Sequence, residues 1–415
     1  MKLSTIVNLV ALSSLCAIAN IDEAQLAKEK KEISKRQMGL TSKITHKRLS
    51  KAQNYATYEQ YDKGIQVLLD LLKQTENRRD EYAQVWQQLG FLFAQKEEMS
   101  LAMKALENSL KVNALPMPQT LVSIYNLAQL YLAEENYEKA HELMVKWFAF
   151  VDKPNAEGYV IMANILAQKD EKEEALKYIN QAINSTDKPD EKWLQLALAL
   201  NFEMENFQNS LKILAILTAQ YPQKDNYWKQ FSGVYLNLKQ DEKALATMEL
   251  AHKLGHLKEE KDILAMVNLQ LFMGLAHRAS VILQKEMQAN KVEVTAQNMD
   301  LLSQCHYAAK DYQQSLETLK IAADLSQDGK LFARLGMMQV QNENWNEAIA
   351  ALEKSLKKGG VDKTDDIYFS LAIARYHQKD IEKAMEHLFK ARELNAKNES
   401  VQRWIDQLKN EKLQA

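Results

Sequence analysis

The sequence contains few residues that break helices. Five prolines and 11 glycines occur among 415 residues, and proline disfavours a helix interior because it lacks a backbone N–H group. All five prolines lie between segments of helical periodicity, where we expect a helix to end. They are Pro116, Pro118, Pro154, Pro189 and Pro222. A chain with so few helix breakers is predicted to be almost wholly α-helical.

The sequence also lacks the short motifs of common catalytic and cofactor sites. It has no Walker loop and no G-x-G-x-x-G, H-E-x-x-H or C-x-x-C pattern. His252 and His256 have the spacing of a metal pair, but Gly255 lies between them and no third ligand is in view. Cys305 and His306 are adjacent, so on a helix they point about 100 degrees apart. We therefore expect no catalytic residue, no metal site and no cofactor. A hydrolase or metal-dependent enzyme within the repeats is the alternative. An activity that is lost when a chelator is added would support it.

The N-terminal residues have the pattern of a secretory signal. A lysine is followed by an apolar run over 6–15 and then by Ala17-Ile18-Ala19, a small-x-small cleavage site. We expect cleavage after Ala19, so that the mature chain begins at Asn20. Cys16 is not expected to carry lipid, because a leucine precedes it where a lipobox has a small residue. No other run approaches the roughly 18 apolar residues of a membrane span.

Residues 20–51 differ in charge from the rest of the chain. They contain nine Lys and Arg against four Asp and Glu, a net charge of +5, whereas residues 52–415 have a net charge of −8. One interpretation of the predicted N-terminal segment, 20–44, is a basic arm that touches an acidic partner or an anionic lipid surface. The other is a solvated capping helix that leads into the repeats. No nucleic-acid partner is predicted.

The segment 123–147 reads as a helical hairpin. Ile124, Leu127 and Tyr131 recur at helical spacing, and a second apolar face follows at Ala140 and Met144. The polar stretch between them, 134–136, is so short that the second helix must run antiparallel to the first. Ala140 is predicted to lie where the two helices cross, because a small side chain allows a close approach.

Small residues equivalent to Ala140 recur through the chain. Their spacing is 33 to 38 residues, which clusters near the 34-residue period of a helix–turn–helix repeat. They are Gly64, Ala102, Ala140, Ala175, Ser210, Ala244, Ala279, Ser315, Ala348 and Ala384. The sequence therefore predicts about ten hairpins over 45–397. A further amphipathic helix in 398–415 is expected to cap the last one.

Several of these hairpins resemble tetratricopeptide repeats. The signature residues stand in three stretches: Trp86, Leu89, Gly90, Phe93, Ala102 and Leu106; Trp228, Phe231, Ser232, Tyr235 and Ala244; and Phe332, Leu335, Gly336 and Ala348. The copies at 190–223 and 260–293 need a one-residue adjustment in the turn. The resemblance covers about nine tenths of the chain and implies an all-α, right-handed α-solenoid.

In tetratricopeptide proteins the first helix of each repeat lines a concave wall that binds ligands. The resemblance therefore implies a groove with aromatic and amide side chains, suited to an extended peptide or a partner helix. The positions carried over by repeat phase are Gln87, Phe91, Tyr125, Gln129, Asn164, Asn226, Lys229, Met337, Phe369 and Tyr376. The paired Asn and Lys clamp of carboxylate-terminus binders in the family is missing.

The order of dissimilar repeats resembles one bacterial family more closely. Stretches such as VWQQLGFLFAQKEEMSLAMKALE and YWKQFSGVYLNLKQDEKALATME are similar to periplasmic tetratricopeptide proteins associated with TonB, ExbB and ExbD. This resemblance implies a periplasmic scaffold, an accessory of a machine that powers outer-membrane uptake of iron complexes. A scaffold for outer-membrane protein assembly or polysaccharide export stays open, because it would use the same groove.

Overall fold

The computed structural model describes residues 22–37 and 41–414. The predicted signal, its cleavage site and Cys16 lie outside the described residues. Every regular element in these two ranges is an α-helix, so the predicted all-α fold of repeated hairpins with a C-terminal helix is confirmed. By their contacts the helices form two compact units that meet in the sequence at Leu217 and Thr218, inside α12.

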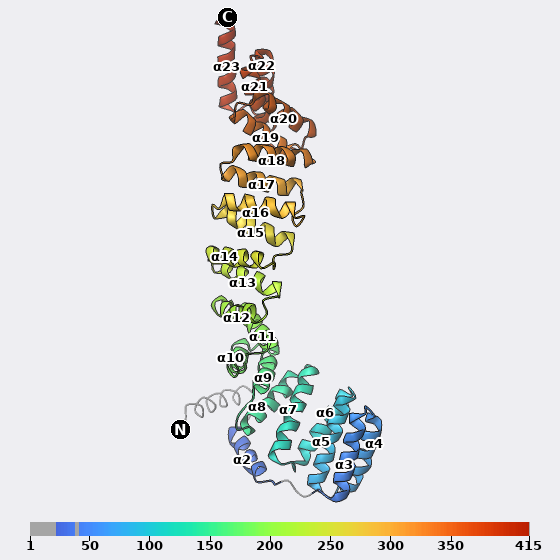
Figure 1. The fold of residues 1–415 in the computed structure, drawn as a ribbon. Helices are drawn as coiled ribbons and strands as arrows, with labels where there is room; N and C mark the ends of the chain where they lie inside the picture. Colours follow the sequence, from blue (N-terminus) through green and yellow to red (C-terminus); the bar gives the residue numbers. More distant parts are fainter. Residues whose placement is uncertain (1–21, 38–40, 415) are drawn as a thin grey trace. The chain divides into compact units, whose positions relative to one another are not determined.

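Unit 1 begins with α2 (Glu23–Ser34) and continues with helical hairpins (Figure 1). Each hairpin is a first helix followed by a second helix. The pairs are α3 (Lys43–Thr57) with α4 (Tyr61–Thr75), α5 (Arg79–Gln95) with α6 (Met99–Val112), α7 (Met117–Ala133) with α8 (Tyr137–Phe150), α9 (Ala156–Gln168) with α10 (Lys172–Asn184), and α11 (Glu191–Glu203) with α12 (Phe207–Gln220).

Unit 2 continues the same pattern from the end of α12 and closes with a single helix. Its hairpins are α13 (Asp225–Asn237) with α14 (Asp241–Lys253), α15 (Glu260–Phe272) with α16 (Ala276–Gln288), α17 (Ala296–Ala308) with α18 (Tyr312–Leu325), α19 (Lys330–Gln341) with α20 (Trp345–Lys358), and α21 (Thr364–His377) with α22 (Ile381–Leu394). The last helix is α23 (Glu399–Gln414), which packs on α22.

The ten predicted small residues occupy one structural position. Each is the fourth residue of the second helix of its hairpin, and each is buried. Ala140, for example, is fully buried in α8. A side chain of this size leaves room for the first helix to cross closely, as the sequence indicates, and larger groups here would overpack the crossing.

Each hairpin turn also contains one residue in the left-handed backbone region, five positions before the small residue. In nine turns it is a charged residue, such as Glu135 at φ 59°, and in one it is Gly274 at φ 76°. In the α7–α8 turn, the Asn136 N–H donates to the Tyr131 carbonyl at 2.8 Å. This hydrogen bond closes the first helix in a Schellman motif. The nine charged residues hold a conformation that favours glycine.

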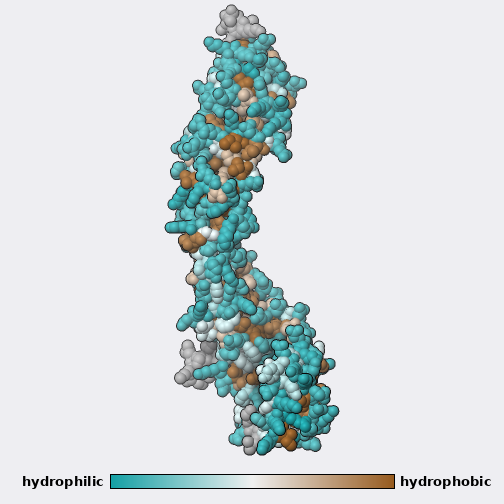
Figure 2. Space-filling view, turned by 45° about the vertical axis from the view of Figure 1, so that its right-hand side comes forward, coloured by the Kyte–Doolittle hydropathy of each residue, from teal (hydrophilic) through white to brown (hydrophobic). Residues whose placement is uncertain are grey.

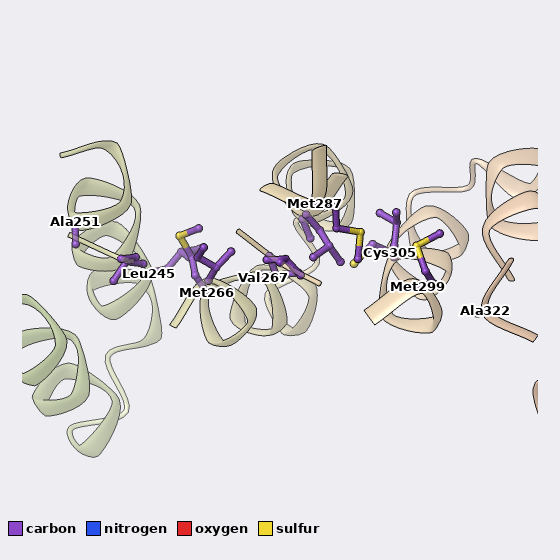
Figure 3. Close-up of a cluster of buried hydrophobic side chains, with 14 of the residues drawn as sticks. Leu245, Ala251, Met266, Val267, Met287, Met299, Cys305 and Ala322 are labelled. Carbon is purple, nitrogen blue, oxygen red and sulfur yellow. The ribbon is translucent and has the colours of Figure 1, made fainter. Parts of the chain in front are cut away.

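Within each unit the core extends across neighbouring hairpins. In unit 2, Leu245 of α14, Met266 of α15, Met287 of α16 and Cys305 of α17 belong to one buried cluster (Figure 3). Such contacts between neighbours are what stabilise a repeat array, because a single hairpin cannot bury its apolar face.

One detail of the sequence interpretation is wrong. Pro118 does not lie between repeats, because it is the second residue of α7, two positions after the N-cap Pro116. A proline is tolerated there because the first N–H groups of a helix have no partner within the helix.

Candidate partner-binding surface

The first helices lie on the inner side of the array in unit 1 and, in unit 2, at α19 and α21. Neighbouring first helices touch one another: α3 with α5, α7 with α9 and α9 with α11 in unit 1, and α19 with α21 in unit 2. Among the described residues, no pair of successive second helices makes a comparable contact. An array whose first helices lie closer together than its second helices curves toward the first helices. The candidate surface is therefore the solvent-facing side of the first helices, taken separately for each unit.

In unit 1 the structure leaves most of the predicted residues at the surface. Gln129 is exposed, and Phe91 and Asn164 are half-buried. The Asn164 side-chain amide donates to the Val160 carbonyl of its own helix at 2.9 Å, so its oxygen is the atom that faces outward. Three of the five predicted positions in this unit can thus be reached by a partner without moving a helix.

Tyr125 belongs to an aromatic cluster on the same side of unit 1. Its ring lies 5.7 Å from that of Trp147, and Trp147 contacts Phe148, which contacts Tyr159. Burial and the nearby Glu157 carboxylate raise the pKa of Tyr125, so its hydroxyl stays protonated and can donate a hydrogen bond. The half-buried ring offers an edge to a partner while its other side is packed.

Gln87 does not fit the predicted role. Its side chain is 4% exposed, and its amide nitrogen donates to the Gln119 carbonyl at 2.9 Å and to the Ser123 hydroxyl at 2.7 Å. Both partners belong to α7, so Gln87 links two consecutive hairpins. A buried donor with two partners is a structural group, and Gln87 is not retained as a binding residue.

In unit 2 the predicted polar residues are partly engaged within the protein. Lys229 of α13 lies within ion-pair distance of Glu259 and, at 2.6 Å, of Asp262. These carboxylates raise the pKa of Lys229, with Asp262 making the larger contribution. Asn226 is exposed, whereas Met337 packs at the edge of a buried cluster. Lys229 therefore joins two repeats, and only Asn226 is fully open.

The two predicted aromatic anchors of unit 2 lie under the C-terminal helix. The Phe369 and Tyr376 rings are 6.5 Å and 5.3 Å from the Trp404 ring of α23, both edge to face. They are half-buried in the cluster that α23 covers. Removing either ring is expected to loosen α23, so a loss of binding on truncation would not by itself identify a contact.

The structure reveals an apolar row in unit 2 that the sequence interpretation missed. It consists of Leu236, Phe272 and Tyr307, 36 and 35 residues apart at the C-terminal ends of successive first helices, together with Tyr312. Phe272 is 78% exposed and Tyr307 is 49% exposed. The Tyr307 and Tyr312 rings pack against each other at 5.4 Å. The recurrence near 35 residues is a signal in the sequence, and the predicted Tyr376 has the same place in α21 as Tyr307 has in α17, three residues before the left-handed turn residue. The sequence interpretation does not extend this position to Leu236 and Tyr307.

Exposed apolar side chains also occur away from this row. Figure 2 shows apolar side chains in separate groups on a largely hydrophilic face. Isolated exposed apolar residues are ordinary in proteins. A row that repeats once per hairpin is different, because a segment lying across the first helices would contact each member in turn.

The groups that could suggest catalysis have structural roles. Cys305 is fully buried, and burial raises the pKa of its thiol to about 11. The adjacent His306 is buried, and burial lowers its pKa. His252 lies 3.2 Å from Glu286, whereas His256 is bound to Asp225 and stacked on Trp228. Within 22–37 and 41–414, no three potential metal ligands come together.

Family models of the tetratricopeptide repeat match residues 156–188 and 334–399. These ranges contain α9 with α10 and most of α19 to α22. Within these two ranges the chain contains tetratricopeptide repeats. Stacked repeats of this kind form extended concave surfaces that bind other molecules.

Individual relatives match only in part. A Drosophila melanogaster "BBSome complex member BBS4 homolog" is 26% identical over 153 residues, which are 37% of this chain and 30% of that protein. The chain thus aligns with less than a third of that relative's length.

Similar solved structures are also tetratricopeptide proteins. YrrB, described as having an unusual peptide-binding site, is 15% identical, with a TM-score of 0.38, 46% of this chain covered and 96% of its own. The TPR2AB domain of yeast Sti1, in complex with pHSP90, is 17% identical, with a TM-score of 0.32, 61% of this chain covered and 96% of its own.

Proposed function

We propose that this protein is a non-enzymatic scaffold that binds a segment of a partner protein across the first helices of unit 2. The observation that carries the proposal is the apolar row of Leu236, Phe272, Tyr307 and Tyr312. Its members are exposed, Leu236, Phe272 and Tyr307 lie in the last turns of successive first helices, and three of the four residues are aromatic. Aromatic residues of this kind dominate the energetics of protein interfaces.

We further propose a periplasmic location and an accessory role in a TonB–ExbB–ExbD system. The support comes from the sequence: a secretory signal in residues 1–19 and an order of repeats similar to that bacterial family. Among the described residues, no helix is both long and apolar enough to cross a bilayer. The alternative is a scaffold for outer-membrane protein assembly or polysaccharide export, which would use the same surface for another partner.

The test is a titration of the purified chain against the periplasmic domains of TonB and ExbD, comparing two double variants. Phe272→Ala with Tyr307→Ala removes two members of the apolar row. Each buried anchor is worth roughly 1.5–3 kcal/mol, so affinity should fall by about a hundredfold or more. The matched control is Leu250→Ala with Ile321→Ala, which removes two side chains, each 47% exposed, from second helices.

The outcomes separate the two parts of the proposal. Binding that survives the first double variant, or falls equally in the control, would exclude the apolar row as the contact surface. No binding to either domain, with capture of a defined outer-membrane assembly factor that depends on Phe272 and Tyr307, would keep the surface and replace the TonB assignment.

A further inference from the structure

The helix α2 packs against the third hairpin of unit 1, although it precedes the first hairpin in the sequence. Its buried residues, Leu26 and Ile33, are 7% and 1% exposed, and it contacts α8 (Figure 1). The Glu29 carboxylate pairs with Lys146 of α8 at 2.6 Å. The segment 20–44 is therefore not a cap on the first repeat, because its helix is fixed on the surface of the third.

Two residues after α2, Arg36 and Ser42, form hydrogen bonds to later hairpins. Arg36 donates to the Leu115 carbonyl, between α6 and α7, at 3.2 Å. Further on, the Ser42 N–H donates to the Glu81 carboxylate at the start of α5 at 2.7 Å. The Arg36 side chain and the Ser42 backbone thus each bind a later hairpin, and we call residues 22–37 and 41–47 together the N-terminal strap.

The outer face of α2 carries lysines. Lys28, Lys31 and Lys35 are spaced three and four residues apart, which places them on one side of the helix. This side is opposite Leu26 and Ile33, and all three lysines are exposed. Among the described residues, none of them makes an ion pair, whereas Lys30, at the flank of the helix, lies 3.2 Å from Asp152.

The start of α3 extends this charged surface. Lys43 and Lys47 are exposed, also without an ion pair in the part of the chain that the structure describes. Ile44 lies between them and is 63% exposed. An exposed branched aliphatic side chain among lysines has no structural role in unit 1.

We propose that the outward face of the N-terminal strap binds the surface of an anionic lipid bilayer. The lysines have flexible stems and no shared pocket, which suits a diffuse layer of headgroups and not one fixed carboxylate. Polybasic segments are attracted to anionic membranes by the summed surface potential. Ile44 enters the interface between the headgroups. Packing of α2 on α8 orients the lysines before binding, so they need not be ordered at the membrane.

Charge elsewhere in unit 1 determines the orientation on that surface. The five hairpin turns of unit 1, at 58–60, 96–98, 134–136, 169–171 and 204–206, contain eight acidic and two basic residues. They lie at the hairpin ends opposite those that Arg36 and Ser42 of the strap contact. An anionic bilayer attracts the strap and repels the turns, so unit 1 binds with the turns directed away. This inference does not depend on the identity of the protein partner.

The experiment is co-sedimentation of the mature chain with vesicles. One set is phosphatidylcholine alone, and the other contains a quarter phosphatidylglycerol. We expect binding to the anionic vesicles only, weakening with salt because exposed charges are screened. The triple variant Lys28→Gln, Lys31→Gln, Lys35→Gln should weaken it by roughly fivefold per lysine, about a hundredfold together.

A matched control removes the same charge elsewhere. Lys285→Gln, Lys320→Gln and Lys357→Gln replace three exposed lysines of unit 2 that make no ion pair in the described residues. This control should bind like the wild type. Equal losses in the two triple variants, or equal binding to neutral and anionic vesicles, would overturn the proposal. Binding to polyglutamate but not to anionic vesicles would also overturn it, in favour of an acidic protein partner.

Discussion

Each hairpin turn contains a residue with left-handed backbone angles, and replacing this residue by glycine should stabilise the protein. Glycine substitutions more often destabilise a protein. Glu135 has a φ of 59°, a region that costs a residue with a side chain about 1–2 kcal/mol. Glycine removes that cost, but it also increases the conformational entropy of the unfolded chain, which lowers the free energy of unfolding by about 0.4–1 kcal/mol. Glu135→Gly should therefore stabilise unit 1 by about 0.5–1 kcal/mol. Glu135 is exposed and makes no ion pair within the described residues, so no contact is lost.

The same substitution seven residues later should have the opposite effect. Glu142 is exposed in the interior of α8, where glycine costs up to about 1 kcal/mol relative to a good helix former. In unit 2, Gly274 has a φ of 76° and open space where a Cβ would lie, so Gly274→Ala should cost about 1 kcal/mol through its backbone alone.

The assay is urea unfolding, followed by far-ultraviolet circular dichroism, with each variant compared with the wild type. Repeat arrays can unfold in more than one transition, so the transition that responds to Glu142→Gly identifies the one to read for Glu135→Gly. If Glu135→Gly lowers the midpoint of that transition as Glu142→Gly does, the turn is not left-handed and the reasoning fails.

Three further predictions follow from buried groups. Ala140→Leu should overpack the α7–α8 crossing and destabilise unit 1 by roughly 1–3 kcal/mol; a urea midpoint equal to that of the wild type would place Ala140 away from the crossing. Burial lowers the pKa of His141 in the folded protein below 6.5. The unfolded chain therefore binds a proton at His141 more readily than the folded protein does, and the free energy of unfolding falls as the pH drops from 6.5 through the folded pKa. His141→Leu should therefore flatten the dependence of unfolding free energy on pH below 6.5; urea titrations at several pH values measure it, and a dependence equal to that of the wild type would contradict this. Trp404→Ala should remove the contact between α23 and Phe369. The loss in unfolding free energy should be less than the roughly 3–5 kcal/mol of a fully buried tryptophan, because Trp404 is half-buried. Amide hydrogen exchange in α23 should become faster, and exchange that stays slow throughout α23 would contradict this.

The sequence alone determined the repeat. Ala140 and its nine equivalents could be found because each hairpin buries its own small residue at a fixed distance from its own turn. The distance between the small residue and the turn is set within one hairpin, and it recurs in every repeat. The helix ends followed for the same reason, as at Gly359, which ends α20 at φ 73°. Local periodicity and capping are read directly from neighbouring residues.

Only the tertiary structure decided which of the predicted surface residues are free. Gln87 is buried because an α7 carbonyl and hydroxyl accept its hydrogens, and Phe369 is covered because α23 returns over it. The docking of α2 pairs Lys30 with Asp152, 122 residues apart. These contacts join residues that are far apart in the sequence and do not recur with the repeat. They form only where the folded repeats leave a surface exposed. The recurrence of the apolar row can be read from the sequence, but only the folded structure shows that Phe272 and the outward lysines of α2 are exposed.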